Sequence, residues 1–134
     1  MAKPTKREDF RDELLRTIAK ARQMFEADGC SQSRAQYADD SIVSDPGIGA
    51  VFVFFTKSNE ALYVGETGMR IRDREGKYPS PLRDAPWWKQ WHRLHFFPNA
   101  HRGERELLEK FLLLSYRPEY LRHKSIDIST EWFT

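Results

Sequence analysis

A tyrosine and a cluster of arginines in this chain have the side chains that phosphate chemistry requires. Tyr63 ends a short apolar run and stands before Val64-Gly65, and Arg70, Arg72 and Arg74 follow it closely. A guanidinium offers a planar set of N–H donors that matches the oxygens of a phosphate group. A tyrosine hydroxyl beside a glycine, opening into arginine-rich sequence, therefore indicates a place where a phosphate is bound.

The net charge of +2 hides an uneven distribution along the chain. Residues 70–105 hold nine Lys/Arg and four Asp/Glu, a local charge of +5, so the remainder carries −3. Local basic density of this kind suits a polyanion, because phosphate contacts supply affinity without sequence choice. A solvated surface of mixed charges is the alternative, and charge alone leaves both open.

Length and composition favour one folded domain. The chain has 134 residues, of which 40% are hydrophobic and 13% aromatic, so a core of real size is expected. The sequence has no apolar stretch of membrane-spanning length and no secretory pattern at its start. A single cysteine, Cys30, cannot form an internal disulfide, which suits a reducing cytoplasm.

Apolar periodicity predicts the elements that must position these residues. A helix is predicted over 8–28, with Gly29 as its stop, and a polar, irregular connector over 30–47. The later elements are a buried strand over 50–56, a returning strand over 61–64, a short helix over 71–77, a strand over 91–97 and a helix over 104–115.

These elements predict an α/β (α+β) fold with a small, three-stranded, mostly antiparallel sheet flanked by helices. The helix over 8–28 would be an N-terminal extension. The predicted division is an N-terminal helix and connector at 1–44, a core at 45–122 and a C-terminal tail at 123–134.

Four landmarks in the core have a shared spacing. Gly49-Ala50-Val51-Phe52 and Leu62-Tyr63-Val64-Gly65 lie in two apolar runs, and Tyr63 comes eleven positions after Phe52. Ile71-Arg72-Asp73-Arg74 is an apolar-x-x-Arg sequence, and Glu109 begins a Glu-x-x-Leu pattern within the helix predicted over 104–115, with proline nine residues beyond it. Together these landmarks, over about residues 47–121, resemble the GIY-YIG nuclease superfamily.

The resemblance implies a divalent-metal-dependent endonuclease that hydrolyses DNA phosphodiester bonds. Glu109 would bind Mg²⁺ or Mn²⁺, Arg74 would hold the phosphate, and Tyr63 would orient or deprotonate the attacking water, with Tyr78 as a further hydroxyl near the site. Mg²⁺ often binds through one or two carboxylates together with water and substrate oxygens. The DNA backbone would contact the basic residues of the core: Arg70, Arg72, Lys77, Lys89 and Arg93.

The sequence also departs from the family pattern. Phe52 stands where the first motif has tyrosine, and Glu66 could repel phosphate or assist a metal. One extra residue between Tyr63 and Arg74 makes Arg72 a rival for the phosphate-binding role. The alternative hypothesis is therefore a catalytically weak or inactive GIY-YIG-like module that binds nucleic acid or serves assembly. The N-terminal helix would mediate a homodimer or contact a partner protein.

Each of these residues also has an ordinary structural interpretation. A strand tyrosine such as Tyr63 usually packs in the core, and Arg74 and Glu109 would usually be solvated. The tryptophans at 87, 88 and 91 either stack on bases or fill the core, and core is favoured for at least one. His92 and His95 on a strand would point to opposite faces, which disfavours a shared metal.

Overall fold

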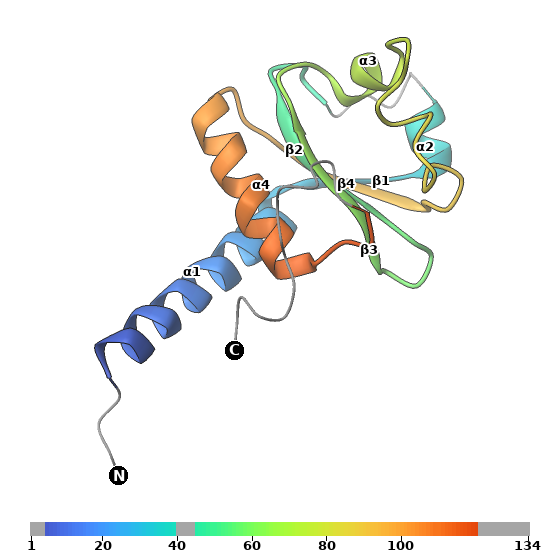
Figure 1. Cartoon of the computed structure of the whole chain (residues 1–134). Coiled ribbons are helices and arrows are strands. Elements are labelled where there is room, and N and C mark those ends of the chain that lie inside the picture. Colours follow the sequence, from blue (N-terminus) through green and yellow to red (C-terminus); the bar gives the residue numbers. More distant parts are fainter. Residues whose placement is uncertain (1–4, 40–44, 121–134) are drawn as a thin grey trace.

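The centre of the protein is a four-stranded antiparallel sheet with the strand order β1-β4-β2-β3. The computed structural model describes residues 5–39 and 45–120. Two helices cover each face of the sheet, α1 and α4 on one side and α2 and α3 on the other (Figure 1). The strands are β1 (Cys30–Ser33), β2 (Ala50–Phe55), β3 (Ala61–Thr67) and β4 (Arg93–Pro98), and the helices are α1 (Lys6–Asp28), α2 (Arg34–Ala38), α3 (Ile71–Glu75) and α4 (Arg102–Tyr116).

The predicted three-stranded sheet is wrong by one strand, although the α+β class is confirmed. The additional strand, β1, lies in the stretch predicted as an irregular connector and pairs with β4, with Cys30 opposite Phe96 and Ser33 opposite Arg93. Its sequence, Cys-Ser-Gln-Ser, has no apolar alternation, so the backbone pairing with β4 and not the side-chain pattern makes it a strand. The helix that follows it, α2, was also absent from the prediction. The predicted boundary at residue 44 therefore separates β1 from the sheet to which it belongs.

Helix α1 is the element that the sequence predicted most closely. Thr5 and Glu8 form a capping box at its start, with each side chain bonded to the other residue's backbone N–H. It ends at Gly29, whose backbone is extended, and a Cβ at this position would lie 2.5 Å from Nε2 of His95, so only glycine fits. The C-terminal half packs against α4 and buries Phe25 fully, whereas the N-terminal half projects away from the body (Figure 1).

The two faces of the sheet form separate cores, here called the α3 face and the α4 face. β2 contributes to both, which explains its nearly continuous apolar sequence. The α3 face holds Phe52, Phe54, Tyr63, Leu94 and Phe96 with Trp87 and Trp91. The α4 face holds Val51, Val53, Phe55 and Val64 with Phe25 and the α4 leucines Leu108, Leu112 and Leu113. The expectation that at least one tryptophan fills the core is confirmed, since Trp87 and Trp91 are each 2% exposed.

The predicted hairpin of β2 and β3 is confirmed, with small shifts of the strand bounds. β3 extends three residues beyond the predicted end, and the predicted strand over 91–97 begins only at Arg93.

Within the described segments, no helix is long and apolar enough to cross a lipid bilayer.

Candidate functional site

The two motif strands pair so that their aromatic residues meet over a glycine. Phe52 of β2 lies opposite Gly65 of β3. A Cβ on Gly65 would lie 2.7 Å from Cζ of Phe52 and 2.9 Å from Cε1 of Tyr63. The glycine of the second motif is therefore required by the close approach of two rings.

Tyr63 packs as a core aromatic on the α3 face. Only 7% of the residue is exposed, and its ring stacks on that of Trp87 with centroids 5.0 Å apart and an angle of 17° between the planes. Offset stacking of this kind stabilises the pair beyond simple burial. The phenol ring is therefore fixed in place between β3 and the ring of Trp87.

Glu109 lies on α4, which packs on the α4 face. Its neighbours Leu108 and Leu112 are buried in that core. Glu109 is half-buried, and its Oε2 atom is shielded from solvent. Because the ring of Tyr63 belongs to the other face, the sheet lies between that ring and the helix that carries the acid.

The rival arginines of α3 differ in what they contact. Nη1 of Arg72 donates a hydrogen bond to the backbone carbonyl oxygen of Tyr37. The guanidinium of Arg72 also lies 5.6 Å from the centre of the Tyr37 ring. Arg72 thus joins α3 to α2. The half-buried Arg74 forms no ion pair or side-chain hydrogen bond with any residue of 5–39 or 45–120, so its donors are available to a ligand. Of the two, Arg74 is better placed to bind phosphate.

The other predicted site residues near α3 are exposed except for Arg70. Tyr78 is 93% exposed, and Lys77 and Lys89 are also exposed. Arg70 is half-buried, and its Nε atom is shielded from solvent without a hydrogen-bond partner in the described segments.

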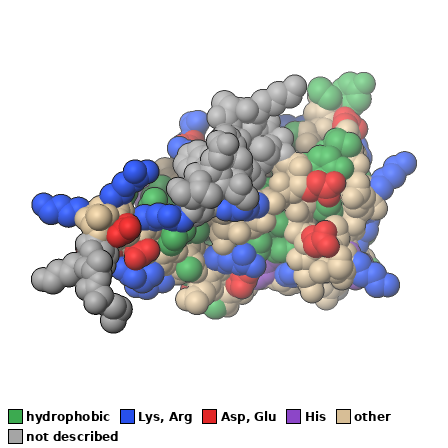
Figure 2. Space-filling model, turned by 60° about the horizontal axis from the view of Figure 1, so that its bottom comes forward, with side chains coloured by type: hydrophobic (Ala, Val, Ile, Leu, Met, Phe, Trp, Pro, Cys, Tyr) green, Lys and Arg blue, Asp and Glu red, His purple; other side chains and the backbone are tan. Residues whose placement is uncertain are grey.

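Several arginines of the basic stretch 70–105 are paired with glutamates, as in the mixed-charge alternative that the sequence left open. The guanidinium of Arg105 is buried and its Nε lies 3.0 Å from Oε2 of Glu66, so the charge of this acid is neutralised by an ion pair. Arg83 and Arg102 are paired with nearby glutamates, at 3.5 and 2.8 Å. On the face of the molecule that Figure 2 shows, cationic and anionic side chains are likewise interspersed.

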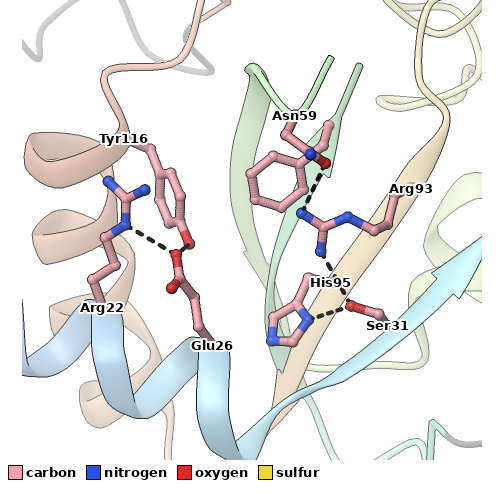
Figure 3. Close-up of a pocket in the computed structure, with 8 residues that line it drawn as sticks. Arg22, Glu26, Ser31, Asn59, Arg93, His95 and Tyr116 are labelled. Atoms are coloured by element: carbon pink, nitrogen blue, oxygen red, sulfur yellow. Dashed lines mark hydrogen bonds and ion pairs between the residues drawn. The ribbon is translucent and has the colours of Figure 1, made fainter. Parts of the chain in front are cut away.

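Arg93 lies apart from the other predicted DNA contacts. It points from β4 into an open pocket of about 320 Å³ on the α4 face, between α1, α4 and the sheet (Figure 3). The pocket is lined by Arg22, Glu26, Ser31, Phe55, Asn59, Arg93, His95 and Tyr116. Most of these residues were not predicted as a site.

A hydrogen-bonded chain connects β1, β4 and α1 at the wall of this pocket. Nε2 of His95 lies 2.7 Å from the carbonyl oxygen of Phe25, and Nδ1 lies 2.6 Å from the hydroxyl of Ser31. Because a carbonyl only accepts, Nε2 carries the proton in the neutral ring and Nδ1 accepts from Ser31. Burial, assisted by the charge of Arg93, lowers the pKa of His95 below its ordinary value, which favours this neutral form.

The opposite wall holds a carboxylate between two donors. Oε1 of Glu26 accepts from the hydroxyl of Tyr116 at 2.5 Å and from Nε of Arg22 at 3.0 Å. Burial acts to raise the pKa of Glu26, but these two hydrogen bonds outweigh it and the net pKa is lowered. Burial, together with the adjacent carboxylate, raises the pKa of the Tyr116 phenol. Both groups therefore keep their ordinary charge at neutral pH.

The described segments contain no group of three or more His, Cys, Asp or Glu side chains placed to hold a metal ion. The expected Mg²⁺ or Mn²⁺ therefore depends on Glu109, with water and substrate oxygens completing the coordination. A hard divalent cation accepts such a set, but one carboxylate alone does not define a site.

The geometry defines an α+β protein with a four-stranded antiparallel sheet. A scan against protein-family models and searches of curated proteins and of solved structures each found no match.

Proposed function

We propose that this protein is a divalent-metal-dependent nuclease that hydrolyses DNA phosphodiester bonds through its GIY-YIG-like core. The observation that carries the proposal is the unit formed by β2, β3 and α3. Its motif strands pair directly and α3 follows at once with Arg74, whose guanidinium has no ion pair within 5–39 or 45–120. A cytoplasmic location, which a lone Cys30 suits, belongs to the same proposal.

Each residue has a defined task in such a reaction. Arg74 binds the phosphate oxygens, with hydrogen bonds that strengthen as negative charge develops. Glu109 would hold the cation at the outer edge of β3, where the two faces of the sheet meet, and the cation would supply charge neutralisation there. Tyr63 orients the attacking water, and the exposed Tyr78 contacts the substrate next to Arg74. An ordinary phenol has a pKa of about 10, so Tyr63 requires a neighbouring cation to act as a base.

The test is cleavage of labelled single-stranded, duplex and branched DNA, with RNA in parallel, in Mg²⁺ or Mn²⁺. We expect cleavage by the wild type and a loss of at least about a hundredfold in Arg74→Ala and Glu109→Gln, as for other residues that act on the transition state. Glu104→Gln is the matched control, because Glu104 is an exposed acid on the first turn of the same helix.

Two results would contradict the nuclease proposal. One is a folded wild-type protein that cuts none of these substrates with either metal. The other is equal cleavage by Glu109→Gln and Glu104→Gln.

A second candidate function is a module that binds nucleic acid or serves assembly without cleavage. The observation that favours it is the packing of Tyr63 on Trp87, on the face of the sheet that α4 does not cover. Phe52 also favours this candidate, because it stands where the first motif has tyrosine and therefore lacks a hydroxyl group. Binding of labelled DNA that falls with salt, without cleavage, would support this candidate. Cleavage gained only in Phe52→Tyr would support it as well.

Helix α1 is proposed as the contact to a second copy or to a partner protein. Phe10 and Leu14 are 70% and 43% exposed and lie four residues apart, on one side of the projecting half. Such a contact would bring a second set of core residues to a DNA duplex.

A further inference from the structure

The pocket on the α4 face contains an arginine that is held in place by neutral groups. The guanidinium of Arg93 lies 4.2 Å from the centre of the Phe55 ring. Its Nη1 donates to the hydroxyl oxygen of Ser31 at 3.2 Å, and its Nη2 lies 3.5 Å from Oδ1 of Asn59 (Figure 3). A ring beneath the guanidinium and a polar group at each end fix its orientation before any ligand arrives.

The charge of Arg93 is not neutralised within the described segments. It forms no ion pair with a residue of 5–39 or 45–120, and both its hydrogen-bond partners are uncharged. Glu26 lies across the pocket, but it is engaged by Arg22 and Tyr116. With His95 neutral, the pocket carries a net charge of about +1 from its side chains.

The hydrogen-bond directions leave Arg93 as the main donor to a ligand. The hydroxyl proton of Ser31 is directed to Nδ1 of His95, because Nε2 is committed to the carbonyl of Phe25. Ser31 therefore turns its lone pairs toward Arg93. A guanidinium has five N–H groups, and Ser31 and Asn59 use two of them, so three remain.

We propose that this pocket binds the carboxylate group of a small organic acid, with Arg93 as the recognition residue. The planar donors of a guanidinium match the two oxygens of a carboxylate. A pocket charge of +1, with Glu26 on the far wall, suits a monoanion better than the dianion of a phosphate monoester. A volume of about 320 Å³ suits a small ligand.

This proposal does not depend on the nuclease proposal. Tyr63, Arg74 and Glu109 do not line the pocket, and binding is measured here without DNA or metal.

The test is a titration of the full chain with sodium benzoate, followed by the amide and Arg Nε–H signals in NMR spectra. We expect saturable shifts at Ser31, Asn59 and Arg93. The affinity should fall at least about tenfold in Arg93→Gln, as expected for loss of a hydrogen-bonded charge. Inorganic phosphate at equal ionic strength is the second ligand and should bind more weakly than benzoate.

A second variant keeps the test decisive if Arg93→Gln perturbs folding. Asn59→Asp changes an exposed loop residue with φ of 65°, a conformation that aspartate tolerates, and places a competing carboxylate beside Arg93. Benzoate should then bind at least about tenfold more weakly. Arg102→Gln, at an exposed site outside the pocket, should bind like the wild type. Equal affinity in all variants, shifts confined to α3, or tighter binding of phosphate would overturn the proposal.

Discussion

Gly65 illustrates how closely a single motif residue is tied to its neighbours. Its missing side chain leaves room for the rings of Phe52 and Tyr63, which a Cβ would approach to less than 3.0 Å. Neither ring can withdraw easily, because each packs in the core of the α3 face. We expect Gly65→Ala to lower the free energy of unfolding by about 1 to 3 kcal/mol, the usual cost of overpacking. Urea denaturation of the wild type and of Gly65→Ala measures this difference in the free energy of unfolding.

Gly103 provides the matched control for this prediction. It lies on α4, and a Cβ added there would have no neighbouring atom within 4 Å, so the methyl group of alanine meets nothing. Gly103→Ala should leave stability unchanged or raise it by up to about 1 kcal/mol, because alanine is the better helix former. If both substitutions had the same effect, the packing account of Gly65 would be wrong.

His95 gives the protein a specific dependence of stability on pH. Its folded pKa lies below the ordinary value, first because the ring is buried and further because Arg93 is close. The unfolded chain therefore takes up a proton at a higher pH than the folded protein. The folded protein is thus stabilised by keeping His95 neutral. This stabilisation is fully present above about pH 6.5 and is lost as the pH falls through the folded pKa of His95.

We expect the wild type to lose more stability than His95→Gln on acidification below about pH 6.5, with an excess slope of at most about 1.4 kcal/mol per pH unit. Glutamine does not titrate, yet its amide can still donate to the carbonyl of Phe25. The groups that face His95 are Ser31, Arg93, Glu26 and that carbonyl, and Glu26 stays ionised in this range because its own pKa is lowered. Parallel pH profiles for the two proteins would refute this account.

At the scale of elements, α1 divides into a docked half and a projecting half. Ile18 is 5% exposed, whereas Leu14, one turn earlier, is 43% exposed. Ile18→Ala should lower the free energy of unfolding by about 2 to 4 kcal/mol because it leaves a cavity. Leu14→Ala should cost less than about 1 kcal/mol. Equal losses in thermal or chemical unfolding would show that the whole helix is docked.

The sequence predicts some elements well, for reasons that the structure makes plain. α1 and α4 have apolar side chains at helical spacing along one side, and both were predicted within two residues. β2 and β3 were predicted because two apolar runs flank a polar loop of hairpin length. β1 has only polar side chains and one cysteine, so its pairing with a strand some sixty residues later left no local pattern.

The candidate site was predictable in its residue types but not in its geometry. The resemblance to GIY-YIG nucleases predicted Tyr63, Arg74 and Glu109 as site residues, and within the described segments the structure leaves the guanidinium of Arg74 available. Spacing does not reveal which face of the sheet a strand residue occupies once a bulge intervenes, as one does between Phe54 and Phe55. The pocket around Arg93 was missed for another reason. Its wall forms only when Ser31 lies opposite His95, and that register requires β1.

At the scale of the whole molecule, the projecting half of α1 leads to a prediction about assembly. A second copy that covers Phe10 and Leu14 would produce a dimer, which light scattering measures directly. The double substitution Phe10→Glu with Leu14→Glu should then give a monomer of unchanged fold. Arg11→Gln, on the same exposed stretch, should leave the dimer intact. A wild-type protein that is monomeric at every concentration would remove α1 as a self-association surface.

The strand order also has a consequence for how the polypeptide folds during synthesis. β2 and β3 are neighbours in the chain and can close their hairpin early, but β4 must insert between β1 and β2. Until residues 93–98 emerge from the ribosome, β1 has no partner and one side of β2 stays open. A nascent chain halted before that point would present unsatisfied strand edges, and we expect it to depend on chaperones and to associate with other chains.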